Sequence, residues 1–217
     1  MADAGRAGEA ARQALNGARP PFEWGVAARA LPGEEVSGDR AVVAANGNRA
    51  LVAAIDGLGH GRHAADAAEA AARVLDSLGD ADVVEATERC HEALRATRGA
   101  AISLASFTDE PPAITWLGVG SVEGRLVPGR ARDPRHESLL LRPGLAGQEL
   151  PPLTPATLPV ERGDLLVFAT DGVRGDFADA LDVTGTCSSI AERVLRRHGR
   201  QTDDALVAVV RYLGSVW

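Results

Sequence analysis

The amino-acid sequence predicts an α+β domain in which antiparallel strands are layered with a few helices. Most of the chain consists of short apolar segments separated by turns rich in Gly and Pro. Helical patterns are confined to two adjacent segments in the first half and one late segment. Strands joined by short turns favour antiparallel pairing, and helices grouped in blocks favour layers over a doubly wound sheet.

The strands are expected where apolar or alternating runs end at turn residues. The sequence Asn-Gly-Asn at 46–48 predicts a hairpin between the two runs that flank it. The expected strands cover residues 22–30, 40–45, 50–55, 101–107, 113–119, 121–127, 137–142, 165–169 and 206–212.

Three helices are expected. The Ala-rich segment 64–78 has the composition of a buried helix, and Gly79 is suited to end it. Asp82 is suited to cap a second helix, whose apolar residues recur at helical spacing until Gly99. A third helix is expected at about 188–198.

Length and cysteine content limit the domain organisation and the compartment. The 217 residues fit one domain, expected at 22–217 after a flexible N-terminal lead-in at 1–21. Cys90 and Cys187 lack C-x-x-C spacing, so we predict neither a disulfide nor a zinc site. The sequence has no signal-peptide pattern and no run of about 18 apolar residues, so we expect a cytoplasmic protein without a membrane span.

The charged residues exclude several kinds of ligand and chemistry. A net charge of −7 and a pI near 5.3 would repel nucleic acid, because binding to a phosphate backbone depends on a basic protein face. All 23 basic residues are arginine. The absence of lysine excludes Schiff-base chemistry and the lysine of a P-loop.

Four short acidic motifs follow strands or begin turns. They are Ser37-Gly38-Asp39, Asp56-Gly57-Leu58-Gly59-His60-Gly61, Thr170-Asp171-Gly172 and Thr202-Asp203-Asp204. Each motif alone is explained by a turn or a helix cap. Together they predict a site, because Asp56 and Asp171 both follow strongly apolar strands and would face each other across a sheet edge. Such like charges are unfavourable, and a hard cation that prefers oxygen ligands, magnesium or manganese, would neutralise them.

A dinucleotide-binding turn is the alternative interpretation of the glycines at 57, 59 and 61. The pattern G-x-G-x-x-G would need glycine at position 62, where this chain has Arg62. Asp56 would also place a negative charge beside the pyrophosphate. Both details favour the metal site.

The acidic motifs are part of a resemblance that runs from about residue 37 to residue 212. Asp56-Gly57-Leu58-Gly59-His60-Gly61, Ala169-Thr170-Asp171-Gly172-Val173 and Asp203-Asp204-Ala205-Leu206 resemble the signatures of the bacterial PPM phosphatases of the SpoIIE class. The RsbX-type subgroup, the small phosphatases of the stressosome, is similar also at Ser37-Gly38-Asp39, Glu88-Arg89-Cys90, Arg98-Gly99-Ala100 and Gly118-Val119-Gly120-Ser121-Val122.

This resemblance implies an αββα sandwich, two antiparallel sheets packed face to face with helices outside, and a centre of two manganese or magnesium ions. The metal ligands that it implies are Asp39, Asp56, Gly57 through its carbonyl, Asp171, Asp203 and Asp204. Asp56 would bridge both ions, and Asp39 would support the site directly or through water. Asp204 stands at a position where relatives vary.

The activity implied is hydrolysis of phosphoserine or phosphothreonine on a regulatory partner, a stressosome-type scaffold or an anti-sigma-factor antagonist. Asp56 and Asp171 would be catalytic, because two ions activate water and neutralise charge during in-line attack, with no phosphoenzyme. Two alternatives stay open, a catalytically silent binding module of this fold and a metal-dependent hydrolase of a small phosphate ester.

The roles of three residues near the motifs, His60, Arg62 and Arg174, stay open at this point. His60 could be a general acid, but its spacing from Asp56 differs from that in the eukaryotic pattern Asp-Gly-His-Gly-Gly. Arg62 and Arg174 could hold phosphate, which arginine binds through two hydrogen bonds, or could be surface residues. Cys90 falls on the apolar stripe of a helix and is expected in the core.

Overall fold

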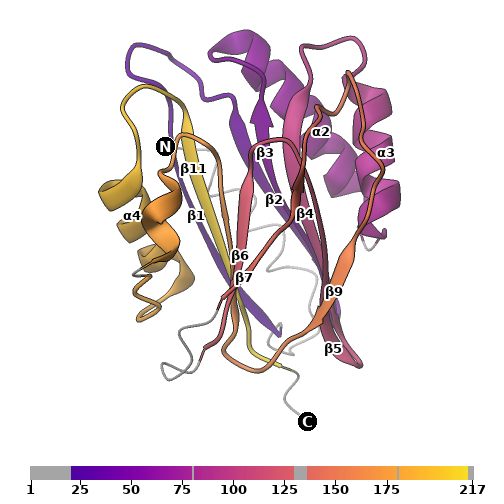
Figure 1. The fold of residues 1–217 in the computed structure, drawn as a ribbon, viewed down its shortest axis with the longest axis vertical. Coiled ribbons are helices and arrows are strands. Elements are labelled where there is room, and N and C mark those ends of the chain that lie inside the picture. Colours follow the sequence, from indigo (N-terminus) through magenta and orange to yellow (C-terminus); the bar gives the residue numbers. More distant parts are fainter. Residues whose placement is uncertain (1–20, 80, 130–135, 180, 215–217) are drawn as a thin grey trace.

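A computed structural model describes residues 21–79, 81–129, 136–179 and 181–214. Two β-sheets pack face to face, and helices cover the outer side of each (Figure 1). This arrangement is the αββα sandwich that the resemblance implies. The expected lead-in at 1–21 lies, except for its last residue, outside the described residues.

One sheet, here called the β11 sheet, has the strand order β1-β11-β10-β6-β7. Its strands are β1 (Phe22–Arg29), β11 (Ala205–Tyr212), β10 (Leu165–Ala169), β6 (Glu123–Val127) and β7 (Glu137–Ser138). All neighbouring strands in it are antiparallel. The last strand of the chain therefore lies beside the first, and its start comes next to the end of β10.

The other sheet, here called the β3 sheet, has the order β2-β3-β4-β5-β8, with β9 also paired to β5. Its strands are β2 (Asp39–Asn46), β3 (Arg49–Gly57), β4 (Ala100–Asp109), β5 (Pro112–Val119), β8 (Leu141–Arg142) and β9 (Ala156–Pro159). The pair β5–β8, which joins two residues of each strand, is parallel, and the other pairs of this sheet are antiparallel.

The single strand expected at 137–142 is wrong. Its first residues form β7 in the β11 sheet, and its last two form β8 in the β3 sheet. Between them, Leu139 is buried in the apolar layer between the sheets, whereas Leu140 is exposed. The chain crosses from one sheet to the other at this point, which a local apolar pattern does not indicate.

Among the described residues, three α-helices complete the layers. Helices α2 (Arg62–Leu78) and α3 (Val83–Leu94) pack on the β3 sheet, and α4 (Cys187–His198) packs on the β11 sheet (Figure 1). The side chain of Asp82 accepts the N–H groups of Val84 and Glu85, which confirms it as the cap of α3.

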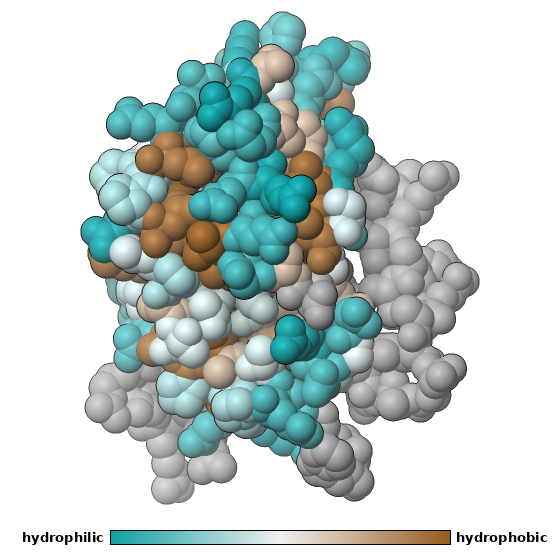
Figure 2. Space-filling view, turned by 90° about the vertical axis from the view of Figure 1, so that its right-hand side faces the viewer, coloured by the Kyte–Doolittle hydropathy of each residue, from teal (hydrophilic) through white to brown (hydrophobic). Residues whose placement is uncertain are grey.

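The surface on the side of α3 is largely hydrophilic, with apolar patches between the polar side chains (Figure 2). Within the described ranges, no helix combines the length and apolar character needed to cross a membrane.

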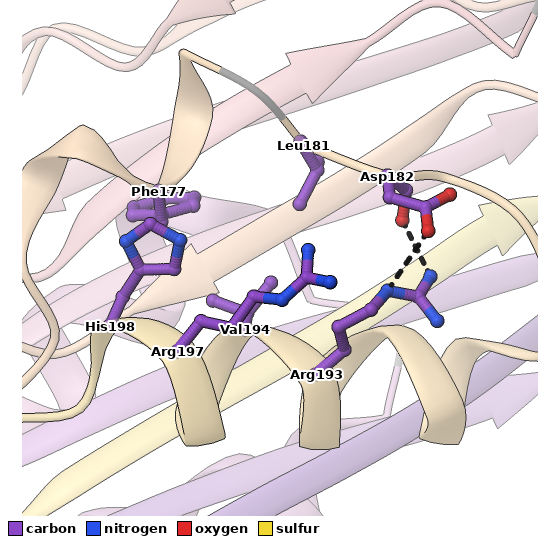
Figure 3. A pocket seen from close by; sticks show the side chains of 7 residues that line it. All are labelled: Phe177, Leu181, Asp182, Arg193, Val194, Arg197 and His198. Atoms are coloured by element: carbon purple, nitrogen blue, oxygen red, sulfur yellow. Dashed lines mark hydrogen bonds and ion pairs between the residues drawn. The ribbon is translucent and has the colours of Figure 1, made fainter.

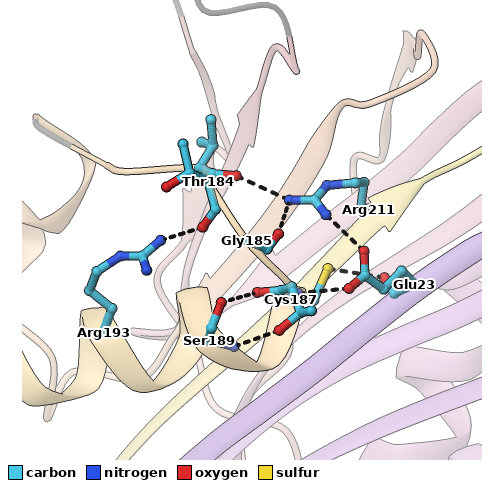
Figure 4. Close-up of polar contacts among 9 residues, drawn as sticks. Glu23, Thr184, Gly185, Cys187, Ser189, Arg193 and Arg211 are labelled. Atoms are coloured by element: carbon cyan, nitrogen blue, oxygen red, sulfur yellow. Dashed lines mark hydrogen bonds and ion pairs between the residues drawn. The ribbon is translucent and has the colours of Figure 1, made fainter.

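A polar cluster fixes the start of α4 to the β11 sheet (Figure 4). The Glu23 carboxylate on β1 accepts the N–H of Cys187 at 3.0 Å and pairs with Arg211 at 2.8 Å. Arg211 also donates to the carbonyls of Val183 and Gly185, at 3.1 and 3.0 Å. The segment that leads into α4 is thereby held on the outer face of the sheet.

The two ends of the sandwich differ in chemistry. At one end, the Phe22 ring lies 5.4 Å from Phe107 and 5.9 Å from Tyr212, centroid to centroid, and the Tyr212 hydroxyl bonds the buried Asp109. At the other end, β3 and β10 finish and β11 begins. The acidic motifs predicted to form the site all lie at this second end.

Candidate active site

Asp39 and Asp56 lie directly opposite each other on the antiparallel strands β2 and β3. Residues paired in this way have Cβ atoms about 4.5–5.5 Å apart, and like charges there are destabilising. Asp39 is 2 % exposed. Burial, and then the charge of Asp56, raises the pKa of Asp39 to about 8, although a hydrogen bond from Thr170 opposes the rise.

Asp171 follows β10 in the β11 sheet, so it approaches Asp56 from the opposite layer. Burial, and then the charge of Asp171, raises the pKa of Asp56 to about 7. The pKa of Asp171 is itself raised by burial and by Asp203, while Arg200 opposes this rise. The expectation that Asp56 and Asp171 face each other across one sheet edge is wrong, because the two lie at the same end of different sheets.

Two hydroxyl groups hold the central carboxylates. Thr170 Oγ1 donates to Asp39 Oδ2 at 2.8 Å and accepts the N–H of Leu206 at 2.9 Å. Ser121 Oγ donates to Asp56 Oδ2 at 3.3 Å. Neither hydroxyl is among the site residues predicted from the sequence, although both lie within the motifs that carry the resemblance.

Asp204 fixes the loop that leads into β2. Its carboxylate oxygens accept the N–H of Leu31 at 2.7 Å and of Gly38 at 2.8 Å, and the residue is 3 % exposed. The carbonyl of Asp204 lies against Gly172, where no Cβ would fit. The two late acidic loops are therefore in direct contact, which requires glycine after Asp171.

The oxygen donors of this end fit a hard divalent cation, because no Cys or His side chain takes part in the charge interactions that link Asp39, Asp56 and Asp171. Among the residues that the structure describes, no three or more His, Cys, Asp or Glu side chains already form a metal cage. Charge interactions act over longer distances than metal–ligand bonds. The carboxylates therefore lie near one another although they do not all reach a single metal position. Magnesium commonly keeps several waters and needs only one or two carboxylates, and such an ion fits this set.

The three residues whose roles stayed open lie outside the carboxylate cluster. His60 Nδ1 is 2.6 Å from Glu34 Oε1, and its side chain is 58 % exposed. Arg62 is the exposed first residue of α2. Arg174 pairs with Asp176 at 3.4 Å and is directed to the end of α4. Glu34, the partner of His60, lies outside the sequence motifs, so no motif predicts this pair.

Neither cysteine is suited to act as a nucleophile. Cys90 and Cys187 are both 0 % exposed and unpaired. Burial raises the pKa of each thiol to about 12, so the reactive thiolate is scarce at neutral pH. The expected core position of Cys90 is confirmed.

A small surface pocket lies between α4 and the 3₁₀ turn η1 (Gly175–Ala178) (Figure 3). It is lined by Phe177, Leu181, Asp182, Arg193, Val194, Arg197 and His198. The Asp182 and Arg193 side chains form an ion pair of 3.3 Å at its edge. None of the aspartates of the acidic motifs lines this pocket, so it is separate from the candidate site.

Comparison with known proteins agrees with the geometry. Phosphoserine phosphatase RsbX of Bacillus subtilis (strain 168) is 27 % identical over 143 residues, which cover 65 % of this chain and 69 % of RsbX. A chain from a solved structure of the bacterial stressosome, a modular system adapted to control secondary messenger signaling, is 28 % identical with a TM-score of 0.79. The superposition covers 88 % of this chain and 99 % of that one.

The fold agrees with a crystal structure of RsbX in complex with magnesium, which is 22 % identical with a TM-score of 0.76. That superposition covers 88 % of this chain and 94 % of the other. The family model of Stage II sporulation protein E (SpoIIE) matches residues 46–213, most of the chain. The chain belongs to the SpoIIE family and is a PPM-type phosphatase similar to RsbX.

Proposed function

We propose that this phosphatase hydrolyses phosphoserine or phosphothreonine on a regulatory partner protein in the cytoplasm. The observation that carries the proposal is the convergence of Asp39, Asp56 and Asp171 from two sheets on one end of the sandwich, where Asp39 is buried and Asp171 is exposed. Similarity to a phosphoserine phosphatase and to a stressosome chain supports a phosphorylated stressosome-type scaffold or anti-sigma-factor antagonist as the partner.

Two manganese or magnesium ions would be held by the oxygen atoms of this site. The proposed ligands are Asp39, Asp56, the Gly57 carbonyl, Asp171, Asp203 and Asp204. When bound, such ions lower the pKa of water and neutralise the charge of a phosphoryl group. Asp56 would be a ligand of both ions, since it lies opposite Asp39 and close enough to Asp171 for the charge of Asp171 to raise its pKa.

The neighbouring residues would orient these ligands. Thr170 directs one oxygen of Asp39, and Ser121 directs one oxygen of Asp56. Neither hydroxyl has to react. The buried thiols of Cys90 and Cys187 are excluded as nucleophiles, which supports attack on phosphorus by water.

The test measures hydrolysis of p-nitrophenyl phosphate and of phosphoserine peptides with manganese, with magnesium and with a chelator. Activity should require the metal, and Asp56→Asn and Asp171→Asn should reduce it to background. Asp66→Asn, an exposed change on α2, is the matched control and should keep full activity. Full activity of Asp56→Asn would refute the assignment.

Two other outcomes would identify the alternatives. Failure of calorimetry to detect divalent binding, with no turnover, would indicate a silent binding module. Turnover of small phosphate metabolites without turnover of phosphopeptides would indicate a hydrolase of small esters.

A further inference from the structure

Two large apolar side chains are exposed within the described part of the chain, Leu58 at 51 % and Leu140 at 67 %. Single exposed leucines are common on protein surfaces and by themselves indicate nothing. Leu58, however, stands two residues after Asp56, in the loop that leaves the carboxylate end of β3. Leu140 lies between β7 and β8, outside the acidic motifs.

Backbone hydrogen bonds hold the loop around Leu58, whose side chain is half exposed. The N–H of Leu58 donates to the Gly99 carbonyl, and the N–H of Gly57 donates to the Gly38 carbonyl, both at 3.0 Å. Gly57 also packs against the Ala64 carbonyl with no room for a Cβ. A leucine side chain that points outward from such a loop is shielded from water when another molecule binds over it.

The positively charged side chain of Arg98 lies beside the same loop. Arg98 is exposed, and its Nη1 lies 3.3 Å from the position that a Cβ on Gly59 would occupy. The turn that carries Arg98 is ordered, because Thr97 Oγ1 donates to the Leu94 carbonyl at 2.7 Å and accepts the Gly99 N–H at 3.0 Å. Arg95, one turn earlier, is by contrast paired with Glu92 at 3.0 Å.

We propose that Leu58 and Arg98 form a docking rim for the phosphorylated segment of a protein substrate. Leu58 would contact an apolar side chain next to the phosphorylated residue, and Arg98 would attract the phosphate. This inference rests on the proposed function. The occupant follows from continuity with the acidic site and from charge, since a phosphate is opposite in sign to Arg98 and is bound well by arginine.

The first experiment compares Leu58→Ser with Leu140→Ser, a matched loss of an exposed leucine. Each is assayed with manganese on p-nitrophenyl phosphate and on two phosphoserine peptides, one with leucine and one with glycine beside the phosphoserine. The unmodified protein should prefer the leucine peptide by about 10-fold in kcat/KM, the factor expected for burying part of a leucine. Leu58→Ser should abolish this preference and leave p-nitrophenyl phosphate turnover unchanged, whereas Leu140→Ser should change neither.

The second experiment compares Arg98→Gln with Arg95→Gln. Arg98→Gln should raise KM for both peptides severalfold with kcat retained, Arg98→Lys should restore part of the loss, and Arg95→Gln should have no effect.

Equal peptide preference in the Leu58 and Leu140 variants, or equal KM in the two arginine variants, would overturn the docking rim. Because every protein is also assayed on p-nitrophenyl phosphate, a failure of the proposed function is seen separately, as absence of any metal-dependent turnover by the unmodified protein.

Discussion

Thr170 and Asp39 join the two sheets through a buried hydrogen bond of 2.8 Å between Oγ1 and Oδ2. Thr170 follows β10 in the β11 sheet, whereas Asp39 begins β2 in the β3 sheet. The same hydroxyl oxygen accepts the N–H of Leu206, so one side chain connects two strands of its own sheet with a carboxylate of the other. The position of Asp39 in the site therefore depends on the packing of both sheets.

Thr170→Val should lower the free energy of unfolding by about 1–3 kcal/mol, because it leaves the Leu206 N–H and Asp39 without a partner in a buried place. Urea denaturation followed by circular dichroism measures this change. Thr170→Ser keeps the hydroxyl and should retain most of the stability. A valine variant as stable as the original protein would show that the hydroxyl contributes nothing.

The metal-free protein should become less stable as the pH rises from about 4 to about 8. The folded pKa values of Asp39 and Asp56, about 8 and about 7, lie above the ordinary value of 3.8, so the native state binds more protons than the unfolded state in this range. One pKa unit corresponds to about 1.4 kcal/mol, so the loss should exceed about 1 kcal/mol. Denaturation with a chelator at pH 5 and pH 8 measures it.

The matched control for this pH effect is Asp39→Asn, which removes the group with the most raised pKa. Its stability should vary less between pH 5 and pH 8. A stability that rises with pH in the metal-free protein would contradict burial of these carboxyl groups.

Binding of magnesium or manganese should release protons and tighten as the pH rises from 6 to 8. The carboxyl groups must lose their protons to become ligands, and two of them hold protons near neutral pH. Calorimetric titrations in two buffers of different ionisation enthalpy give the number of protons released. Binding that involves no proton release at pH 7 would place the ions away from Asp39 and Asp56.

Neither thiol should be needed for activity. Cys90→Ala and Cys187→Ala should each keep the metal-dependent turnover of the original protein, because both thiols are buried and protonated. A colorimetric thiol reagent should react slowly with the folded protein and count two thiols after unfolding in urea. Rapid inactivation by the reagent would contradict this assignment.

Local signals allowed much of the fold to be predicted from the sequence. The apolar runs before Asp56 and Asp171 are strands as expected, and Asp82 caps α3. Strand β9 was missed, because it lies in a segment rich in Pro, which disfavours strands. Helix α3 ends at Leu94, earlier than the apolar spacing indicates, because the chain then turns to carry Gly99 to the Leu58 amide.

The acidic motifs could be picked out from the sequence, and the structure brings them to one end of the sandwich, but the contacts around them could not be predicted. The bonds from Ser121 to Asp56 and from Thr170 to Asp39 join residues 65 and 131 positions apart, a relationship without a local pattern. The placement of Arg98 beside Gly59 likewise follows from the packing of the turn before β4 on the loop after β3. Tertiary packing, not propensity, decides these contacts.

The two ends of the sandwich differ in what a substitution would change: stability at the aromatic end, and mainly activity at the acidic end. The aromatic rings of Phe22, Phe107 and Tyr212 supply cohesion far from the carboxylates, so damage there reduces the folded population and leaves each surviving molecule competent. At the acidic end, repulsion among the carboxylates opposes stability, whereas hydrogen bonds such as that from Thr170 to Asp39 add to it. Loss of a carboxylate that we propose as a metal ligand should therefore remove activity while the protein stays folded.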